Sequence, residues 1–259
     1  MNETLKVIGS RRSVRNYSNT PLTGEEKNTI LGAAMRAPTA GNMMLYSIVE
    51  IEDQSLKDRL AVTCDNQPFI AKAPFVLLFA ADYQRQFDMY TMSQAEEESR
   101  ARGMEFRKPQ EGDLLLACCD AVIAAQTAVI AAESLGIGSC YIGDILEQYE
   151  THRDLLDLPP YAAPVALVCF GRPAVEREEV RLTPRYDPKF IVFKDKYHRL
   201  SRGEMEEMLR PTVERAFPNE YRVEDTDEIA RRIYFRKYAS DFAAEMSRSV
   251  RVMLKNWGK

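Results

Sequence analysis

Residues 120–144 read DAVIAAQTAVIAAESLGIGSCYIGD and predict a long helix, a strand and a turn in succession. Small and aliphatic residues continue over 114–136, which is long enough for a helix that crosses a membrane. Asp120 and Glu133 interrupt this run, and charged groups are costly in lipid, so a helix buried on most sides is favoured. The following GSCYIGD, residues 138–144, predicts the strand and a glycine turn.

Short apolar runs elsewhere predict further strands. They are rich in β-forming residues and read YSIVEIED (46–53), APFVLLFAAD (73–82) and PVALVCFG (164–171). Helices are predicted over residues 4–9 and 146–156. Another follows Thr23, which forms a capping box with Glu26, and ends by Pro38. The residues that this helix is expected to bury are Ile30, Leu31, Ala34 and Met35.

The C-terminal region carries one apolar stripe at helical spacing from Thr226 to Trp257. Asp225 is the expected N-cap of a helix of about thirty residues, roughly 45 Å long. This length favours an arm that lies on a partner subunit, while a surface helix on its own subunit is the alternative. Residues 83–113 are polar and charged, which favours a helical excursion or lid, and the sequence leaves open whether it moves.

Composition excludes several classes of function. The chain has 259 residues and a net charge of −4, so bulk attraction to nucleic acid or anionic membranes is not expected. Five cysteines, odd in number and without CxxC spacing, argue against a disulfide framework or a zinc site. The N-terminal MNETLKVIGS lacks the pattern of an export signal, so a cytoplasmic location is expected.

RRSVRNY, residues 11–17, gathers three arginines and a serine. Such a run is either a solvated charged face or an anion site, since guanidinium groups bind phosphate oxygens bidentately. GIGSCYIG, residues 136–143, follows a helix and enters a strand, the reverse of the Rossmann order. Its glycines can instead present backbone N–H groups to a flat ligand. In APTAGN, residues 37–42, Thr39 and Asn42 are candidate donors on a loop that is otherwise a plain connection.

In combination these segments resemble the flavin-dependent nitroreductase family. RRSVRNY looks like the family's Arg-x-Ser-x-Arg motif, and APTAGN looks like its Pro-Ser/Thr-x-x-Asn loop. DNQPFIAKAPFVLLF, the 120–144 stretch and TPRYDP (183–188) are similar to later family segments, in family order. The resemblance implies an α+β fold with a central, mostly antiparallel sheet flanked by helices, in an intertwined homodimer. Residues 1–200 would be the FMN-binding domain and 201–259 a helical extension on the partner subunit.

The resemblance also implies a site for tightly bound FMN at the subunit interface. Arg11, Arg12, Ser13 and Arg185 would hold the phosphate, and Arg15 would lie near the pyrimidine edge. Asn66 or Gln67 would reach the ribityl chain or ring edge, and the backbone of Ile142 and Gly143 would lie against the ring. The partner subunit would contribute Pro38, Thr39 and Asn42.

The implied activity is transfer of reducing equivalents from NAD(P)H to nitroaromatics, quinones or other electron-poor acceptors by a ping-pong mechanism. No catalytic side chain and no metal site are expected, because the flavin carries the chemistry. The same scaffold also hosts dehalogenation, flavin fragmentation and heterocycle oxidation, and a non-catalytic flavin-binding protein is the other alternative. Met44 departs from the family pattern, because many relatives have an amide there, so acceptor polarity stays open.

Overall fold

The computed structural model describes residues 1–175, 182–217 and 223–257. Internal contacts divide the chain into two compact units. The first is Met1–Arg181 together with Glu245–Lys259, and the second is Leu182–Ala244. This division differs from the predicted boundary at residue 200, because the segment that follows Arg181 groups with the second unit and the end of the chain returns to the first.

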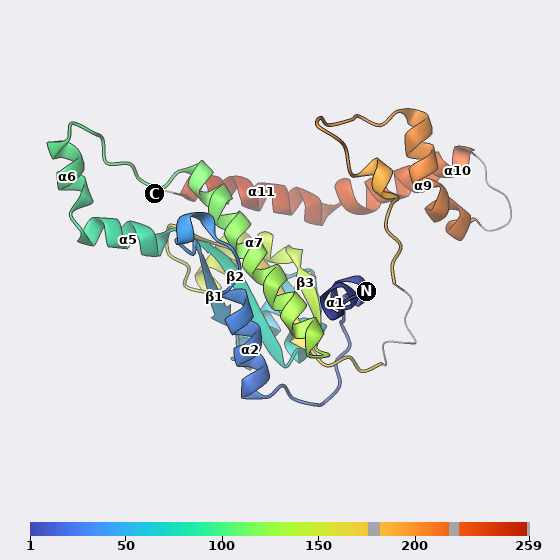
Figure 1. The fold of residues 1–259 in the computed structure, drawn as a ribbon, viewed down its shortest axis with the longest axis horizontal. Helices are drawn as coiled ribbons and strands as arrows, with labels where there is room; N and C mark the ends of the chain where they lie inside the picture. Colours follow the sequence, from blue (N-terminus) through green and yellow to red (C-terminus); the bar gives the residue numbers. More distant parts are fainter. Residues whose placement is uncertain (176–181, 218–222, 258–259) are drawn as a thin grey trace. The chain divides into compact units, whose positions relative to one another are not determined.

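A four-stranded sheet forms the centre of the first unit (Figure 1). Its strands are β1 (Tyr46–Glu50), β2 (Phe75–Asp82), β3 (Gly138–Ile142) and β4 (Ala162–Gly171), in the order β1-β2-β4-β3. Every neighbouring pair is antiparallel, which confirms the predicted sheet. β2 and β4 are the central strands and are apolar on both faces, as strands covered on two sides must be.

Helices α7 (Glu111–Ser134) and α2 (Gly24–Ala34) pack on one face of the sheet. Alanines line the buried face of α7, and their small side chains allow close approach to the strands. The predicted capping box of α2 forms between Thr23 and Glu26. Ile30 and Ala34 are buried as predicted, but Met35 is 57% exposed because the helix ends at Ala34 and its stripe does not extend that far.

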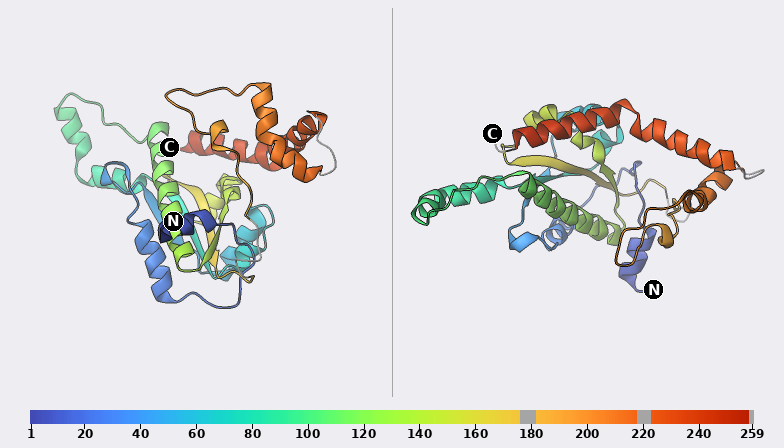
Figure 2. Two further views of the ribbon diagram at one scale, coloured as in Figure 1. Left: turned by 45° about the vertical axis from the view of Figure 1, so that its right-hand side comes forward. Right: turned by 90° about the horizontal axis from the view of Figure 1, so that it is seen from above.

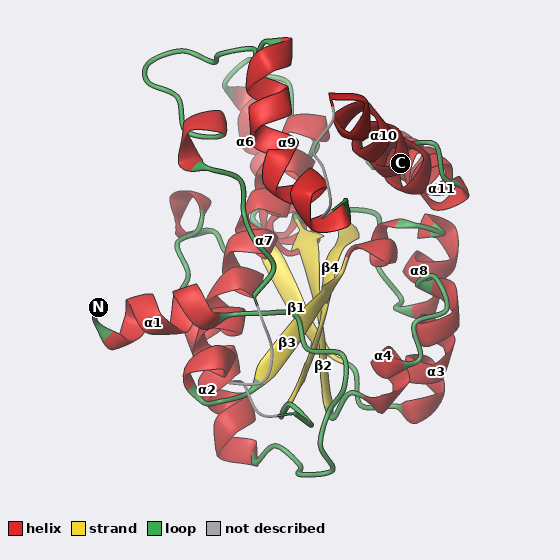
Figure 3. Ribbon diagram, turned by 90° about the vertical axis from the view of Figure 1, so that its right-hand side faces the viewer, coloured by secondary structure: helices red, strands yellow, loops and turns green. Residues whose placement is uncertain are grey.

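The opposite face is covered by α3 (Gln54–Thr63), α4 (Phe69–Lys72) and α8 (Tyr149–Leu155), as Figure 3 shows. The sequence interpretation did not identify α3 and α4, which are short and only weakly amphipathic. α8 begins three residues later than predicted, because Gln148 takes a left-handed conformation with φ 45° and cannot continue a helix from Leu146.

Helix α1 and the helices of residues 83–113 lie outside this central layer arrangement. α1 (Glu3–Ser10) is capped by Asn2, whose side chain accepts from the Leu5 N–H at 2.9 Å. The polar segment 83–113 contains α5 (Gln84–Met92) and α6 (Ala95–Ala101), which extend away from the sheet (Figures 1 and 2). Motion of this segment as a lid stays a prediction.

The prediction of one long C-terminal helix is wrong. The second unit contains α9 (Arg202–Ala216), α10 (Val223–Ile233) and a π-helical turn at Tyr234–Tyr238, and α11 (Asp241–Asn256) follows after a bend. Asp225 is in the first turn of α10 and is not its N-cap. The apolar stripe continues across the break, and periodicity alone does not register a wider turn inserted into a helix.

The end of α11 is anchored to its own chain. Met253 and Trp257 join a buried cluster with Leu45 and Leu114, and the Trp257 ring meets the Tyr161 ring edge-on at 5.8 Å. This helix is therefore not a free arm. Packing on a partner subunit stays a prediction for the extension before Glu245.

α7 is, among the described residues, the one helix long and apolar enough to cross a membrane. Its contacts with the sheet identify it as a core helix. It is buried on one face only, however, and not on most sides as predicted. The outer face leaves Leu115 and Leu116 exposed by 68% and 42%, and Val122 and Ile123 by 46% and 39%.

Candidate flavin site

The arginine segment is fixed along the free edge of β3. The Val14 N–H donates to the Ser139 carbonyl at 2.9 Å, and Ser13 forms a parallel bridge with Ser139. Val14 is buried and lies so close to Gly138 that a Cβ there would be 2.4 Å from its Cγ2 atom. Glycine at position 138 therefore lets the segment approach the strand.

Tyr17 provides the second anchor of this segment. Its ring lies over Gly171, where an added Cβ would be 2.5 Å from the ring, and it bridges to Pro173. The Ser18 N–H donates to the Arg172 carbonyl at 2.9 Å. Because Val14 and Tyr17 point inward, the segment holds its charged residues at the surface.

Three of the four predicted residues in this segment affect the ionisation of the Cys140 thiol. Burial raises the pKa of the Cys140 thiol, whereas Arg15, Ser13 and Arg11 lower it. The Arg15 guanidinium also lies 5.8 Å from the centre of the Phe69 ring. Arg12 differs, because its Nη2 donates to the Val175 carbonyl at 3.4 Å.

The turn after β3 lies beside Gln67. Ile142 is buried, whereas Gly143 is exposed and has open space where a side chain would be. The Gln67 amide donates to Asp144 Oδ2 at 2.7 Å and to the Cys64 carbonyl at 2.9 Å. Asn66 is exposed and left-handed with φ 51°, which turns the chain back at the end of α3.

Two carboxyl groups behind this turn were missed by the sequence interpretation. Asp144 contacts Gln67, and Glu147 is only 5% exposed. Burial, together with the nearby carboxyl groups of Asp144 and Asp65, raises the pKa of Glu147 to about 7. In the sequence, the signal for this pair was an acidic residue, Asp144, directly after the glycine turn.

The loop before β1 is organised by Asp120 of α7. The Thr39 hydroxyl donates to this carboxylate, which also accepts from the Ala40 and Leu45 N–H groups at 3.0 and 3.2 Å. The Thr39 oxygen in turn accepts from the Met44 N–H at 2.8 Å. Thr39 is thus engaged inside the loop and does not offer its hydroxyl hydrogen to a ligand. In the sequence, the signal for the role of Asp120 was the presence of a carboxylate within an otherwise apolar helix.

Pro38 and Asn42 are exposed on this loop, and Asn42 is left-handed with φ 56°. The loop enters β1, whereas the arginine segment lies on β3, and these are the two edges of the sheet. Three strand spacings separate them, roughly 14 Å. A single chain therefore keeps the two groups apart.

Arg185, the remaining predicted phosphate ligand, lies exposed in the second unit. With Arg210 and Arg215 it lines a cavity of about 280 Å³. Its role in the phosphate site stays a prediction.

The donor set on β3 fits FMN. Two guanidinium groups and a serine hydroxyl suit a phosphate or an electron-rich ring edge, and an exposed glycine backbone suits a flat ring. No cluster of three or more metal-ligating side chains occurs within residues 1–175, 182–217 and 223–257.

Comparison with known proteins agrees with this fold. The model of the nitroreductase family matches residues 8–172. The chain belongs to the nitroreductase family. It is 33% identical over 174 residues to the FMN reductase (NADPH) of Bacillus subtilis, covering 67% of each chain. It is 30% identical over 201 residues to the NADPH-flavin oxidoreductase of Vibrio harveyi, covering 78% of this chain and 77% of the relative.

A solved structure extends the likeness of this nitroreductase-family chain. The structure of the hypothetical oxidoreductase YcnD from Bacillus subtilis superposes with a TM-score of 0.77 at 26% identity. The match covers 100% of this chain and 98% of that protein, so it includes the C-terminal region.

Proposed function

We propose that the protein is an FMN-dependent oxidoreductase that uses NAD(P)H as its reductant. The observation that carries this proposal is that the segment with Arg11, Ser13 and Arg15 is bonded along the edge of β3 through Ser139, in a chain of the nitroreductase family. Relatives named FMN reductase (NADPH), NADPH-flavin oxidoreductase and NADPH nitroreductase support the same activity.

FMN, when bound, supplies the two-electron chemistry. The residues of the chain bind and orient it. Arg11 and Ser13 would hold the phosphate, Arg15 would place positive charge near the pyrimidine edge, and Gln67 would contact the ribityl chain or ring edge. The open backbone at Gly143 leaves room for the ring to approach the turn.

We propose a homodimer in which the loop before β1 completes the partner's flavin site. The exposed stripe on the outer face of α7, which contains Leu115, Leu116, Val122 and Ile123, supports this assembly. Large apolar patches on a soluble subunit mark interaction surfaces. Within one chain, Pro38 and Asn42 lie at the opposite edge of the sheet from β3. A second copy would bring its own Pro38 and Asn42 to the β3 edge.

The proposed reaction is ping-pong, with nicotinamide and acceptor occupying the same place in turn. The proposed acceptors are quinones, nitroaromatics and other electron-poor compounds. Met44 lies partly buried against the core and offers an apolar thioether instead of an amide, which favours apolar acceptors such as quinones. A cytoplasmic location is proposed with this activity, since NAD(P)H is found there.

The proposal is tested by purifying the protein and measuring its spectrum during NADPH or NADH addition. We expect a yellow protein that is bleached anaerobically and recovers when menadione is added. Initial rates at several menadione and nitrofurazone concentrations should give parallel double-reciprocal lines. Intersecting lines would contradict the proposal that nicotinamide and acceptor bind at the same place in turn. A colourless protein would contradict the assignment of FMN as cofactor.

A further inference from the structure

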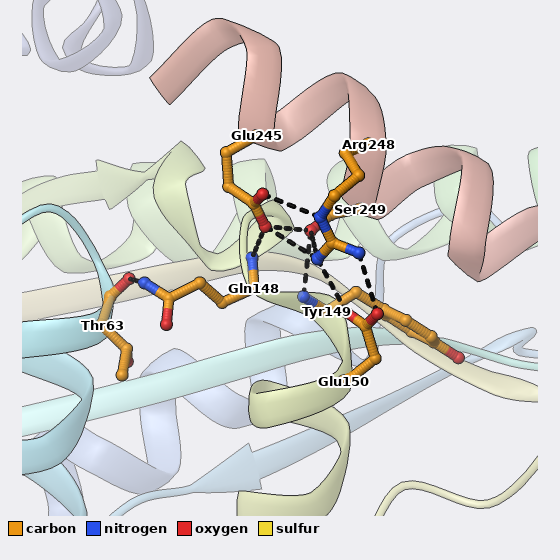
Figure 4. Close-up of polar contacts among 7 residues, drawn as sticks. All are labelled: Thr63, Gln148, Tyr149, Glu150, Glu245, Arg248 and Ser249. Carbon is orange, nitrogen blue, oxygen red and sulfur yellow. Dashed lines mark hydrogen bonds and ion pairs between the residues drawn. The ribbon is translucent and has the colours of Figure 1, made fainter. Parts of the chain in front are cut away.

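The N-terminus of α8 is capped by residues of α11, far along the chain (Figure 4). Gln148 precedes the helix in a left-handed conformation, and its side chain does not cap it. The first N–H groups of a helix need acceptors. Glu245 accepts from the Gln148 N–H at 3.0 Å, and Ser249 Oγ accepts from the Tyr149 N–H at 3.1 Å.

These two acceptors are themselves held in place. The fully buried Ser249 hydroxyl donates to Glu245 at 2.9 Å. Arg248 donates to Glu245 Oε2 at 2.8 Å and lowers the pKa of that carboxyl to about 2, with smaller contributions from Ser249 and Gln148. Arg248 also binds both oxygens of Glu150 at 2.8 Å, on the exposed side. Glu245 is therefore an ionised acceptor of fixed orientation.

The same corner is bonded to the end of α3. The Gln148 side-chain amide donates to the Thr63 carbonyl at 3.0 Å. His152 is fully buried, and its Nδ1 lies 3.0 Å from the Ile145 carbonyl while its Nε2 lies 2.8 Å from the Thr63 hydroxyl. A carbonyl only accepts, so Nδ1 carries the hydrogen. Burial lowers the pKa of His152, which favours this neutral form.

Thr63 leads directly into the chain reversal that presents Gln67, and Gln67 is bonded to Asp144 in the turn after β3. The bonds thus run from α11 through the start of α8 to both sides of the candidate flavin site. One side is the turn at Gly143 and Asp144, and the other is Gln67. Through these bonds α11 can influence the candidate flavin site without any of its side chains touching the flavin.

We propose that Glu245 and Ser249 are positioning residues for the flavin site, because they cap α8 and thereby hold Gln67 and the Gly143 turn in their binding arrangement. This proposal rests on the proposed function. It assigns the C-terminal helix a part in cofactor binding within its own subunit.

The first test is a fluorescence titration of apoprotein with FMN. The double variant Glu245→Ala/Ser249→Ala should raise the dissociation constant by about tenfold, the loss expected from removing two caps. Glu245→Gln, which keeps an acceptor oxygen, should stay within about threefold of wild type. Glu150→Ala removes the exposed ion pair with Arg248 but leaves the Glu245 and Ser249 caps in place, and it should match wild type. An unchanged dissociation constant in a folded double variant would overturn the proposal.

The second test is hydrogen–deuterium exchange of the apoprotein, using the single variant Ser249→Ala in case the double variant does not fold. Exchange should rise about fivefold in peptides covering 61–67 and 142–149, with residues 24–34 of α2 unchanged. A rise confined to α8 and α11 would overturn the proposal. If wild-type protein binds no FMN, the proposed function fails, whereas the exchange result still decides whether α11 holds the two segments.

Discussion

At the scale of single residues, the arginine segment separates into anchors and ligands. Val14 and Tyr17 are inward and pack against glycines, while Arg11, Ser13 and Arg15 face the Cys140 region. Arg12 is directed to a backbone carbonyl instead. Three arginines that are equivalent in the sequence therefore have different surroundings.

Replacement of Arg11 and Arg15 by alanine should weaken FMN binding at least about tenfold, because charge-assisted bonds to phosphate contribute about 1.5–3 kcal/mol each. The fold should persist, since neither side chain is buried. Titration of apoprotein with FMN and far-UV circular dichroism measure the two effects. The matched control is Arg12→Ala, for which a loss as large as that of the double variant would contradict the assignment.

Glu147 should make stability depend on pH. Its folded pKa of about 7 lies above its ordinary value of 4.5, so between these values the folded state holds a proton that the unfolded state releases. Stability should therefore fall by roughly 1–3 kcal/mol as the pH rises from 5 to 8, and Glu147→Gln should remove most of this fall.

Urea unfolding at the two pH values measures this dependence. Glu150→Gln, three residues further along the chain, is the control, because its pKa is lowered and it titrates below this range. An equal fall in Glu147→Gln and wild type would show that another group is responsible.

At the scale of elements, α7 does more than cover the sheet. Asp120, which is 3% exposed, accepts from Thr39, Ala40 and Leu45 and so fixes the loop before β1. The Asp120 carboxylate thereby determines the shape of a loop that is remote in sequence. Asn42 stays exposed on this loop.

Asp120→Ala should destabilise the protein by about 2–4 kcal/mol, because it leaves buried donors without an acceptor. Urea unfolding measures the loss. Gln126→Ala, an exposed position on the same helix, should change stability by less than about 0.5 kcal/mol. Equal stability of the Asp120 variant and wild type would mean that the loop does not depend on this carboxylate.

At the scale of the whole molecule, the apolar outer face of α7 is the interface of the homodimer that we propose. Leu116→Glu combined with Val122→Glu should convert the homodimer to a monomer and reduce its FMN content, because charges would enter the interface and the partner's loop would be lost. Size-exclusion chromatography with light scattering and the flavin absorbance ratio measure both.

Val62→Glu is the matched control, since Val62 is 63% exposed on α3, away from this face. A dimer that survives both charges on α7 would place the interface elsewhere on the subunit.

The sequence by itself determined the family, the strands, the capping box of α2 and the position of α7. These features depend on local periodicity or on short motifs, which the order of residues contains directly. It also selected Arg11, Arg12, Ser13 and Arg15 as candidate ligands, because a dense cluster of charge and hydroxyl is visible without a fold.

Only the tertiary structure decided the break between α10 and α11, the engagement of Thr39 by Asp120, the contact of Gln67 with Asp144 and the capping of α8 by Glu245 and Ser249. Each of the three bonded contacts joins residues 75 or more positions apart. Such bonds form because packing brings polar groups together in places where water cannot satisfy them. Local sequence carries no record of which distant partner will be there.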